Sequence, residues 1–142
     1  MRFEENVVKE FMLNAFDKIA KPFEDGREDG LGSRGFYTLY ILGTYAPKTM
    51  TELGELCKMK KQQTTKVIDT LTELGFAQRI YNRSDRRIIQ IVITEKGREY
   101  LNKQIKAGAD NLMKQIDCLE AEKKNSFIEA LAVINPILKK LN

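Results

Sequence analysis

Residues 61–97 read KQQTTKVIDTLTELGFAQRIYNRSDRRIIQIVITEKG, and the hydrophobic period changes within this stretch. From 61 to 74 the apolar side chains recur at steps of three and four, which predicts a helix, and Gly75 stands where a glycine often caps a helix C-terminus. Segments 76–82 and 88–93 are rich in β-branched and aromatic residues, which predicts two strands. The polar residues between them are typical of a turn. The stretch therefore predicts a helix followed by a β-hairpin with a basic tip.

The residues before this stretch predict the first helix of a helix-turn-helix. Thr49 and Glu52 fit a capping box, in which each side chain accepts a hydrogen bond from the other residue's backbone N–H. A short helix should follow Thr49, with residues 58–60 as the turn before Lys61. Helix, turn, helix and β-hairpin in this order define a winged helix. The predicted fold class is therefore mainly α with a small β-hairpin, built as a winged helix-turn-helix.

The N-terminal part of the chain is expected to be helical as well. Apolar residues recur at steps of three and four over 3–19, and Pro22 should end or bend this helix. Residues 24–35 hold four glycines and few apolar side chains, which predicts a loop. The segment 36–44 is apolar nearly all round, which predicts a central helix that ends before Pro47.

Two further helices are expected after the hairpin. Thr94 suits the N-cap of a long helix that begins at Glu95, and a last helix should run from about residue 120 to 141, where Pro136 should kink it. These helices, like the segment 3–19, carry more large apolar side chains than a small winged helix can cover. A two-fold copy of the chain covers such faces most simply, so the sequence predicts a homodimer.

Composition excludes several functional classes. The 142 residues suffice for one domain with its own core, and 42% hydrophobic with 31% charged residues is typical of a globular protein. The sequence shows neither a membrane-length apolar run nor a signal peptide. The chain has no histidine, which excludes Ser-His and Cys-His catalysis and most zinc sites. Because phosphate loops and nucleophile motifs are absent too, we expect no enzyme, no cofactor and no metal, in a cytoplasmic protein.

Cys57 and the acidic residues of the glycine-rich loop are expected to have no chemical role. Cys57 lies in an apolar stripe and should be a core thiol, whereas Cys118 falls between two helices, where partial exposure is expected. Two cysteines are too few for a disulfide framework, which favours a reducing compartment. We interpret the acidic cluster as solvated rather than metal-binding. It consists of Glu24, Asp25, Glu28 and Asp29.

The positive charge is concentrated in one segment. Residues 57–98 contain ten Lys or Arg and four Asp or Glu, a net charge of +6, whereas the rest of the chain carries −2. A charge run is usually a solvated surface, but this one coincides with the predicted winged helix, which favours a polyanionic partner. Lys and Gln side chains on the helix 61–74 can contact phosphates and base edges in the major groove. Arginines at the hairpin tip suit the minor groove or the backbone.

The sequence resembles the MarR (multiple-antibiotic-resistance regulator) family from about residue 36 to 97. Four motifs carry the resemblance. They are 52–56 (ELGEL) for the family's E-L-A-x-x, 65–76 (TKVIDTLTELGF) for T-x-x-[VI]-D-x-L-x-x-x-G-[LFW], 84–87 (SDRR) for D-x-R, and 93–97 (ITEKG) for L-T-x-x-G. Gly54 replaces a common alanine, and residues 60–63 (KKQQ) depart from the usual serine start of the recognition helix. The operator sequence is therefore not implied.

The resemblance implies a transcription regulator of the MarR type, a homodimeric repressor that binds double-stranded DNA at specific sequences. The chain is then a single domain over 1–142, with the winged helix-turn-helix at 36–97 and a helical dimerisation part at 1–21 and 95–142. Two recognition helices in successive major grooves imply a near-palindromic operator with half-site centres about 34 Å apart. Arg87 should be the wing arginine and Asp85 its partner, a simple turn aspartate being the alternative.

Two sets of site residues follow. The predicted DNA-binding residues are Lys60, Lys61, Gln62, Gln63, Thr65, Lys66, Arg83, Asp85, Arg86 and Arg87. Many members of the family release DNA when a small, often aromatic anionic, molecule binds between the two parts, and ordinary packing is the alternative for each candidate lining residue. These candidates are Phe16, Phe36, Tyr37, Tyr40 and Tyr45. The alternative function is a winged helix that contacts proteins without specific DNA binding, which predicts an apolar or acidic recognition face.

Overall fold

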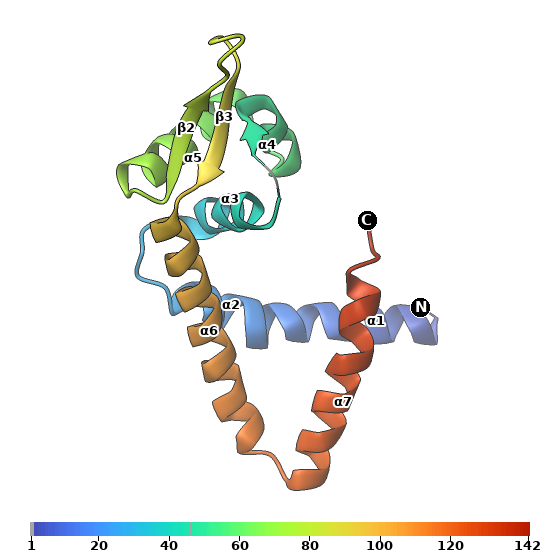
Figure 1. Cartoon of the computed structure of the whole chain (residues 1–142). Helices are drawn as coiled ribbons and strands as arrows, with labels where there is room; N and C mark the ends of the chain where they lie inside the picture. The colour runs from blue at the N-terminus through green and yellow to red at the C-terminus, as the bar shows by residue number, and fades with distance from the viewer. Residues whose placement is uncertain (1, 46) are drawn as a thin grey trace. The chain divides into compact units, whose positions relative to one another are not determined.

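The computed structural model describes residues 2–45 and 47–142, drawn in Figure 1. The chain falls into two compact units, residues 1–106 and 107–142. The first unit holds a helical N-terminal segment, the helix-turn-helix, a three-stranded sheet and the start of α6. Its helix-turn-helix and sheet comprise α3 (Gly32–Thr44), β1 (Lys48–Thr49), α4 (Met50–Leu56), α5 (Lys61–Glu73), β2 (Ala77–Tyr81) and β3 (Ile89–Ile93). The second unit holds the end of α6 (Glu95–Asp117) and α7 (Ala121–Leu138).

Helices α3, α4 and α5 share one core with β3. Leu39 of α3, Leu53 of α4, Ile68 and Leu71 of α5 and Ile91 of β3 have no exposed side-chain surface. Burying each such side chain contributes roughly 1.5–3 kcal/mol, so these five residues hold the helix-turn-helix against the sheet. The prediction that the segment 36–44 forms a central helix is confirmed.

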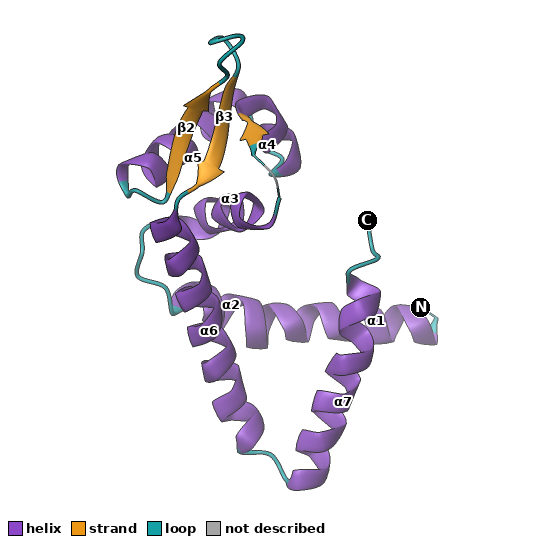
Figure 2. Cartoon of the chain, viewed as in Figure 1, coloured by secondary structure: helices purple, strands orange, loops and turns teal. Residues whose placement is uncertain are grey.

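The sheet contains the predicted hairpin and one further strand (Figure 2). β2 and β3 pair antiparallel with Arg79 opposite Ile91, and β1 pairs antiparallel with the other edge of β3. Two residues are too few to show an alternating pattern, so β1 has no signal in the sequence. Thr49 also caps α4, since its Oγ1 accepts from the Glu52 N–H and Glu52 Oε1 accepts from the Thr49 N–H, each at 3.2 Å. The predicted capping box is therefore confirmed.

The helical turns run past Pro22 instead of ending there. α1 (Phe3–Ala15) continues through a π-helical segment, η1 (Phe16–Ala20), into α2 (Lys21–Asp25). A proline ring inside a helix clashes with the carbonyl four residues earlier, and a π-helical turn changes the hydrogen-bonding register at that point. Pro22 consequently lies in the first turn of α2, where its missing N–H is tolerated.

The glycine-rich loop is shorter than the predicted range of 24–35. Residues 26–31 separate α2 from α3, which begins at Gly32 rather than at the predicted position 36. Leu31 packs against the core and Gly35 is buried. Residues 32–35 are therefore helical because they pack against the core, although their glycine content predicts a loop.

Asp29 is held by residues distant in the sequence. Its carboxylate accepts hydrogen bonds from the Tyr100 hydroxyl of α6 and from the Leu31 N–H, and it lies 3.6 Å from Arg27 Nη1. The side chains of Arg27 and Asp29 are only 5% and 10% exposed. The prediction that Asp29 belongs to a solvated acidic cluster is therefore wrong, since this carboxylate is largely buried and paired. Its partner Tyr100 lies 71 residues further along the chain, so the local sequence gives no sign of the contact.

The remaining predicted features lie close to their expected places. α7 ends at Leu138, three residues before the predicted end, with Pro136 inside its last turn. Cys57 is half-buried against the core, where burial raises the pKa of its thiol, and Cys118 is exposed. None of the helices in the described part of the chain combines the length and hydropathy that a membrane crossing needs. Within that same part, no cluster of three or more Cys, Asp or Glu side chains could hold a metal ion.

Candidate nucleic-acid interface

α5 has a polar face directly opposite its buried one. Its buried residues are Thr64, Ile68 and Leu71. Gln62, Thr65 and Lys66 are exposed on the other side, and Lys61 is exposed at the first turn. Because amide, hydroxyl and ammonium groups all match groups on base edges and phosphates, this face has the chemistry that a major groove accepts.

Gln63 has a structural role at the start of α5. Its Oε1 accepts a hydrogen bond at 3.1 Å from the backbone N–H of Lys60. This bond replaces part of the cap that a serine would supply at the start of the helix. Only the amide nitrogen of Gln63 is then available to donate to a base, whereas Gln62 takes no part in the cap. Gln62 is therefore the better candidate for hydrogen bonding to bases, because the cap of α5 does not use its amide group.

The first turn of α6 fixes the connection between α5 and β2. Gly75 ends α5 with a φ of +77°, a conformation that favours glycine, as its predicted role as a C-cap requires. Thr94 Oγ1 donates to the Gly75 carbonyl at 2.6 Å and accepts from the Gly97 N–H at 3.0 Å, and the Thr94 N–H donates to the Phe76 carbonyl at 2.9 Å. The predicted N-cap role of Thr94 is therefore confirmed, and the same residue anchors the base of the wing.

The wing tip is ordered by the partnership of Asp85 and Arg87. Arg87 Nε and Nη2 donate to the two carboxylate oxygens of Asp85 at 3.1 and 3.2 Å, and the Arg87 backbone N–H donates to Oδ1 at 3.0 Å. Asp85 is thus both a turn aspartate and the bidentate partner of the arginine. The Arg87 side chain remains 91% exposed, so the pair orients this arginine toward solvent at the tip.

The other two tip arginines lie beside a shallow hollow. Arg83 and Arg86 line it together with Tyr81 and Asn82. Asn82 Oδ1 accepts from the backbone N–H groups of Ser84 and Asp85, at 2.8 and 3.2 Å, and so holds the turn that carries these arginines. The tip therefore presents three arginines on a turn stabilised by two acceptor side chains.

We expect Asp85 to titrate below the ordinary range of an aspartate. The Arg87 side chain, and then its backbone N–H, lower the pKa of the Asp85 carboxyl. Because the pKa is lowered in the folded state, the contact is complete above the ordinary aspartate pKa and is lost as the pH falls through the lowered value. Carboxyl-carbon NMR of the Arg87→Ala variant should show the Asp85 midpoint rising. An identical midpoint in variant and wild type would contradict this assignment.

One ion pair joins the two parts of the candidate interface and has no counterpart among the predicted site residues. Arg79 Nη2 of β2 lies 2.5 Å from Asp69 Oδ1 of α5. Asp69 stands out in the sequence only as part of a family motif, and an exposed aspartate and arginine ten residues apart predict no contact by themselves. Their pairing requires the hairpin to fold back beside the helix.

The five aromatic candidates for an effector site lie in separate contacts. The Phe36 ring packs edge-on to Phe23 at 5.3 Å and lies 4.1 Å from the Arg27 guanidinium. Tyr37 and Tyr40 stack at 6.1 Å, the Tyr45 ring faces Lys48 Nζ at 5.9 Å, and Phe16 in η1 is 64% exposed. Only Tyr37 and Tyr40 are brought together, and Phe36 is engaged with Arg27, which the sequence did not single out.

A helix-turn-helix with a polar, basic second helix, followed by an arginine-tipped hairpin, defines a winged helix-turn-helix protein. The sequence model of the MarR family matches residues 29–88, which span the helix-turn-helix and most of the wing. Over residues 29–88 the chain is therefore similar to the MarR family of helix-turn-helix transcription regulators.

Known proteins are similar to this chain along most of its length. The uncharacterised HTH-type transcriptional regulator YpoP of Bacillus subtilis is 27% identical over 124 residues, which cover 87% of this chain and 88% of YpoP. The structure of the transcriptional regulator Tm0710 from Thermotoga maritima matches with a TM-score of 0.73 and 24% identity, covering 96% of this chain and 94% of Tm0710. FabT of Streptococcus pneumoniae, crystallised in complex with DNA, matches with a TM-score of 0.66 and 18% identity, covering 97% and 99%. These two structures share the fold.

Proposed function

We propose that this chain is a homodimeric, sequence-specific DNA-binding repressor whose DNA binding responds to a small molecule. The observation that carries the proposal is the coincidence of the exposed polar face of α5 with the arginine tip of the wing, both in the segment of net charge +6. The alternative, a winged helix that binds protein, favours an apolar or acidic recognition face. The solved complex of FabT with DNA supports DNA as the partner.

We assign the two grooves to different parts of the interface. Side chains at the start of α5 read bases and phosphates in the major groove, and the wing tip reaches the minor groove or the backbone, with Asp85 orienting Arg87. The proposed contact residues are Lys60, Lys61, Gln62, Gln63, Thr65, Lys66, Arg83, Asp85, Arg86 and Arg87. The winged helix-turn-helix at 36–97 would then bind DNA, and the helices at 1–21 and 95–142 would form the dimer.

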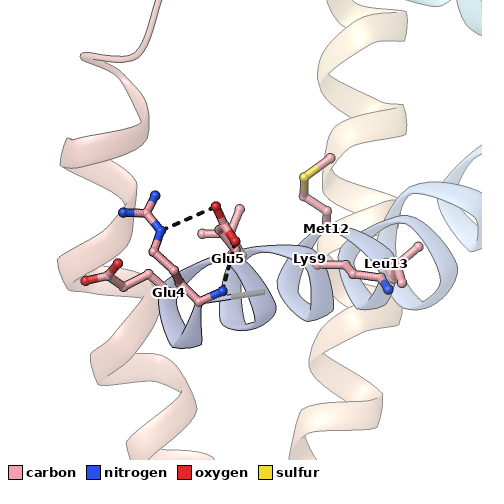
Figure 3. Close-up of a pocket in the computed structure, with 7 residues that line it drawn as sticks. Glu4, Glu5, Lys9, Met12 and Leu13 are labelled. Carbon is pink, nitrogen blue, oxygen red and sulfur yellow. Dashed lines mark hydrogen bonds and ion pairs between the residues drawn. The ribbon is translucent and has the colours of Figure 1, made fainter.

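Exposed apolar faces support the dimer. No residue of α1 or α7 is buried in the single chain. Met12 of α1 and Val133 of α7 are 63% and 65% exposed. Figure 3 shows Lys9, Met12 and Leu13 along α1 beside an open hollow, with Glu4 and Glu5 toward the N-terminus. Exposed apolar side chains along a helix mark an interaction surface, and a two-fold copy would cover the same face on both chains.

The contact that supports an effector site is the stacked pair of tyrosines on α3. Tyr37 and Tyr40 are 46% and 42% exposed and lie on α3. Their rings offer apolar area and their hydroxyls offer hydrogen bonds, which together suit a small aromatic anion. We therefore keep these two tyrosines as the first residues to vary in an effector screen.

Selection from a random DNA pool, followed by anisotropy titration at two salt concentrations, tests the proposal. We expect one dimer on a near-palindromic site, with binding at least about 10³-fold tighter than to unrelated DNA. A reporter placed behind the selected site should fall in expression when the protein is present. Weak, strongly salt-dependent binding to every fragment, with no enriched sequence, would contradict specific DNA recognition and favour a protein partner.

A further inference from the structure

The ion pair between Asp69 and Arg79 links the recognition helix directly to the wing. Asp69 lies on α5 and Arg79 on β2, and the atoms Oδ1 and Nη2 are 2.5 Å apart. The Asp69 side chain is 51% exposed and the Arg79 side chain 30% exposed. A pair exposed to this degree contributes little to folding stability. Stability is therefore a poor explanation for its presence between these two elements.

The charge of Asp69 is unfavourable for DNA binding by itself. Residues three and four apart share one helix face, and Asp69 follows Thr65 and Lys66 on the exposed face of α5. Asp69 is the only acidic residue among the first twelve positions of the helix, residues 61–72. A carboxylate on a face that approaches phosphates repels them. Neither a direct gain in affinity nor a gain in stability accounts for Asp69, which leaves its geometric link to Arg79.

The link acts where a small rotation has a large effect. Arg79 lies in the middle of β2, opposite the fully buried Ile91 of β3. The tip residue Asp85 lies six positions further along, beyond the end of β2 at Tyr81, so the lever is at most about 20 Å at the rise of a β-strand. A tilt of about 10° at Arg79 would then displace the tip by up to about 3 Å, which is the length of a hydrogen bond. Simultaneous contact by α5 and the tip therefore requires a fixed hairpin angle.

We propose that Asp69 and Arg79 are positioning residues, which set the angle of the wing to α5 so that both reach DNA at once. This inference rests on the proposed function, since it requires DNA contact by α5 and the wing. The two residues act through Arg87 and its neighbours at the tip and need not touch DNA themselves.

The variant Asp69→Asn separates this proposal from simple electrostatics. Removing a negative charge from a DNA-facing surface should tighten binding if charge alone matters. The proposal predicts the opposite, a loss of about 10-fold in affinity for the selected site. The exchanged pair Asp69→Arg/Arg79→Asp should recover binding to within about 3-fold of wild type, because it restores the link and the net charge.

Two further measurements complete the test. Asp25→Asn removes the carboxylate of another exposed pair, Lys21–Asp25 at 2.9 Å, and changes the net charge equally, so it should leave DNA affinity unchanged. Hydroxyl-radical footprints of Asp69→Asn should lose protection where the wing tips lie and keep it at the major-groove contacts. Thermal unfolding of Asp69→Asn should match wild type, which shows that the fold is intact.

Two outcomes overturn the inference. They are binding by Asp69→Asn that equals or exceeds wild type, and an exchanged pair that binds as weakly as the single variant. In both cases the wild-type chain still binds its selected site, so the proposed function stands. If the wild-type chain selects no site at all, the proposed function fails and the inference falls with it.

Discussion

Replacing Gly97 with alanine should lower the free energy of unfolding by about 4 kcal/mol. A Cβ at position 97 would lie 2.1 Å from the Phe76 carbonyl oxygen and 3.0 Å from Ile93 Cγ1. Both neighbours are fixed, since the same carbonyl accepts the Thr94 N–H and Ile93 is the last residue of β3. The new methyl group can be accommodated only by moving the start of α6 away from the base of the wing.

The size of the effect follows from what that movement breaks. Overpacking a close contact costs about 1–3 kcal/mol, and stretching the two hydrogen bonds from Thr94 to Gly75 and Phe76 costs about 1 kcal/mol each. For a chain of this length the midpoint of thermal unfolding, followed by circular dichroism, should fall by roughly 15 °C. Glu99→Ala, at an exposed position one half-turn later, should stay close to wild type. A Gly97→Ala midpoint within about 2 °C of wild type would contradict the close approach.

Local signals suffice for the elements that carry the interface. The capping box of Thr49, the cap of Thr94, the left-handed Gly75 and the β-branched run of β3 each depend on residues within a few positions of one another. The Asp85–Arg87 contact is equally local, spanning two residues. The helix-turn-helix, the hairpin and the arrangement of the tip could therefore be predicted from the sequence.

The features that the sequence did not predict depend on distant contacts. Asp69 meets Arg79 only once the hairpin has folded beside α5, and Asp29 meets Tyr100 across 71 residues. The early start of α3 at Gly32 similarly depends on Leu31 packing into the core. For Asp29 and Leu31 the local composition predicts a solvated loop, and burial against remote elements reverses that preference. Asp69 stays exposed, and only the fold of the hairpin gives it a partner.

Arg87→Ala should weaken DNA binding by about 30-fold and do so for every DNA sequence. The Arg87 side chain is 91% exposed and is aimed by two hydrogen bonds to Asp85. Its remaining guanidinium N–H groups can donate to phosphate oxygens. In a homodimer the substitution removes this contact from both wings, so its effect on the free energy of binding is doubled.

The dependence of affinity on salt distinguishes a phosphate contact from other roles of Arg87. Each lost phosphate contact lowers the log–log slope by about 0.9, so the dimer should lose about 1.8. Anisotropy titrations between about 50 and 200 mM salt measure this slope. Gln62→Ala is the matched contrast, because a base-reading side chain should change which sequences are selected while leaving the slope unchanged. An Arg87→Ala slope equal to that of wild type would show that this arginine contacts no phosphate, and the wing would then have to act through Arg83 and Arg86.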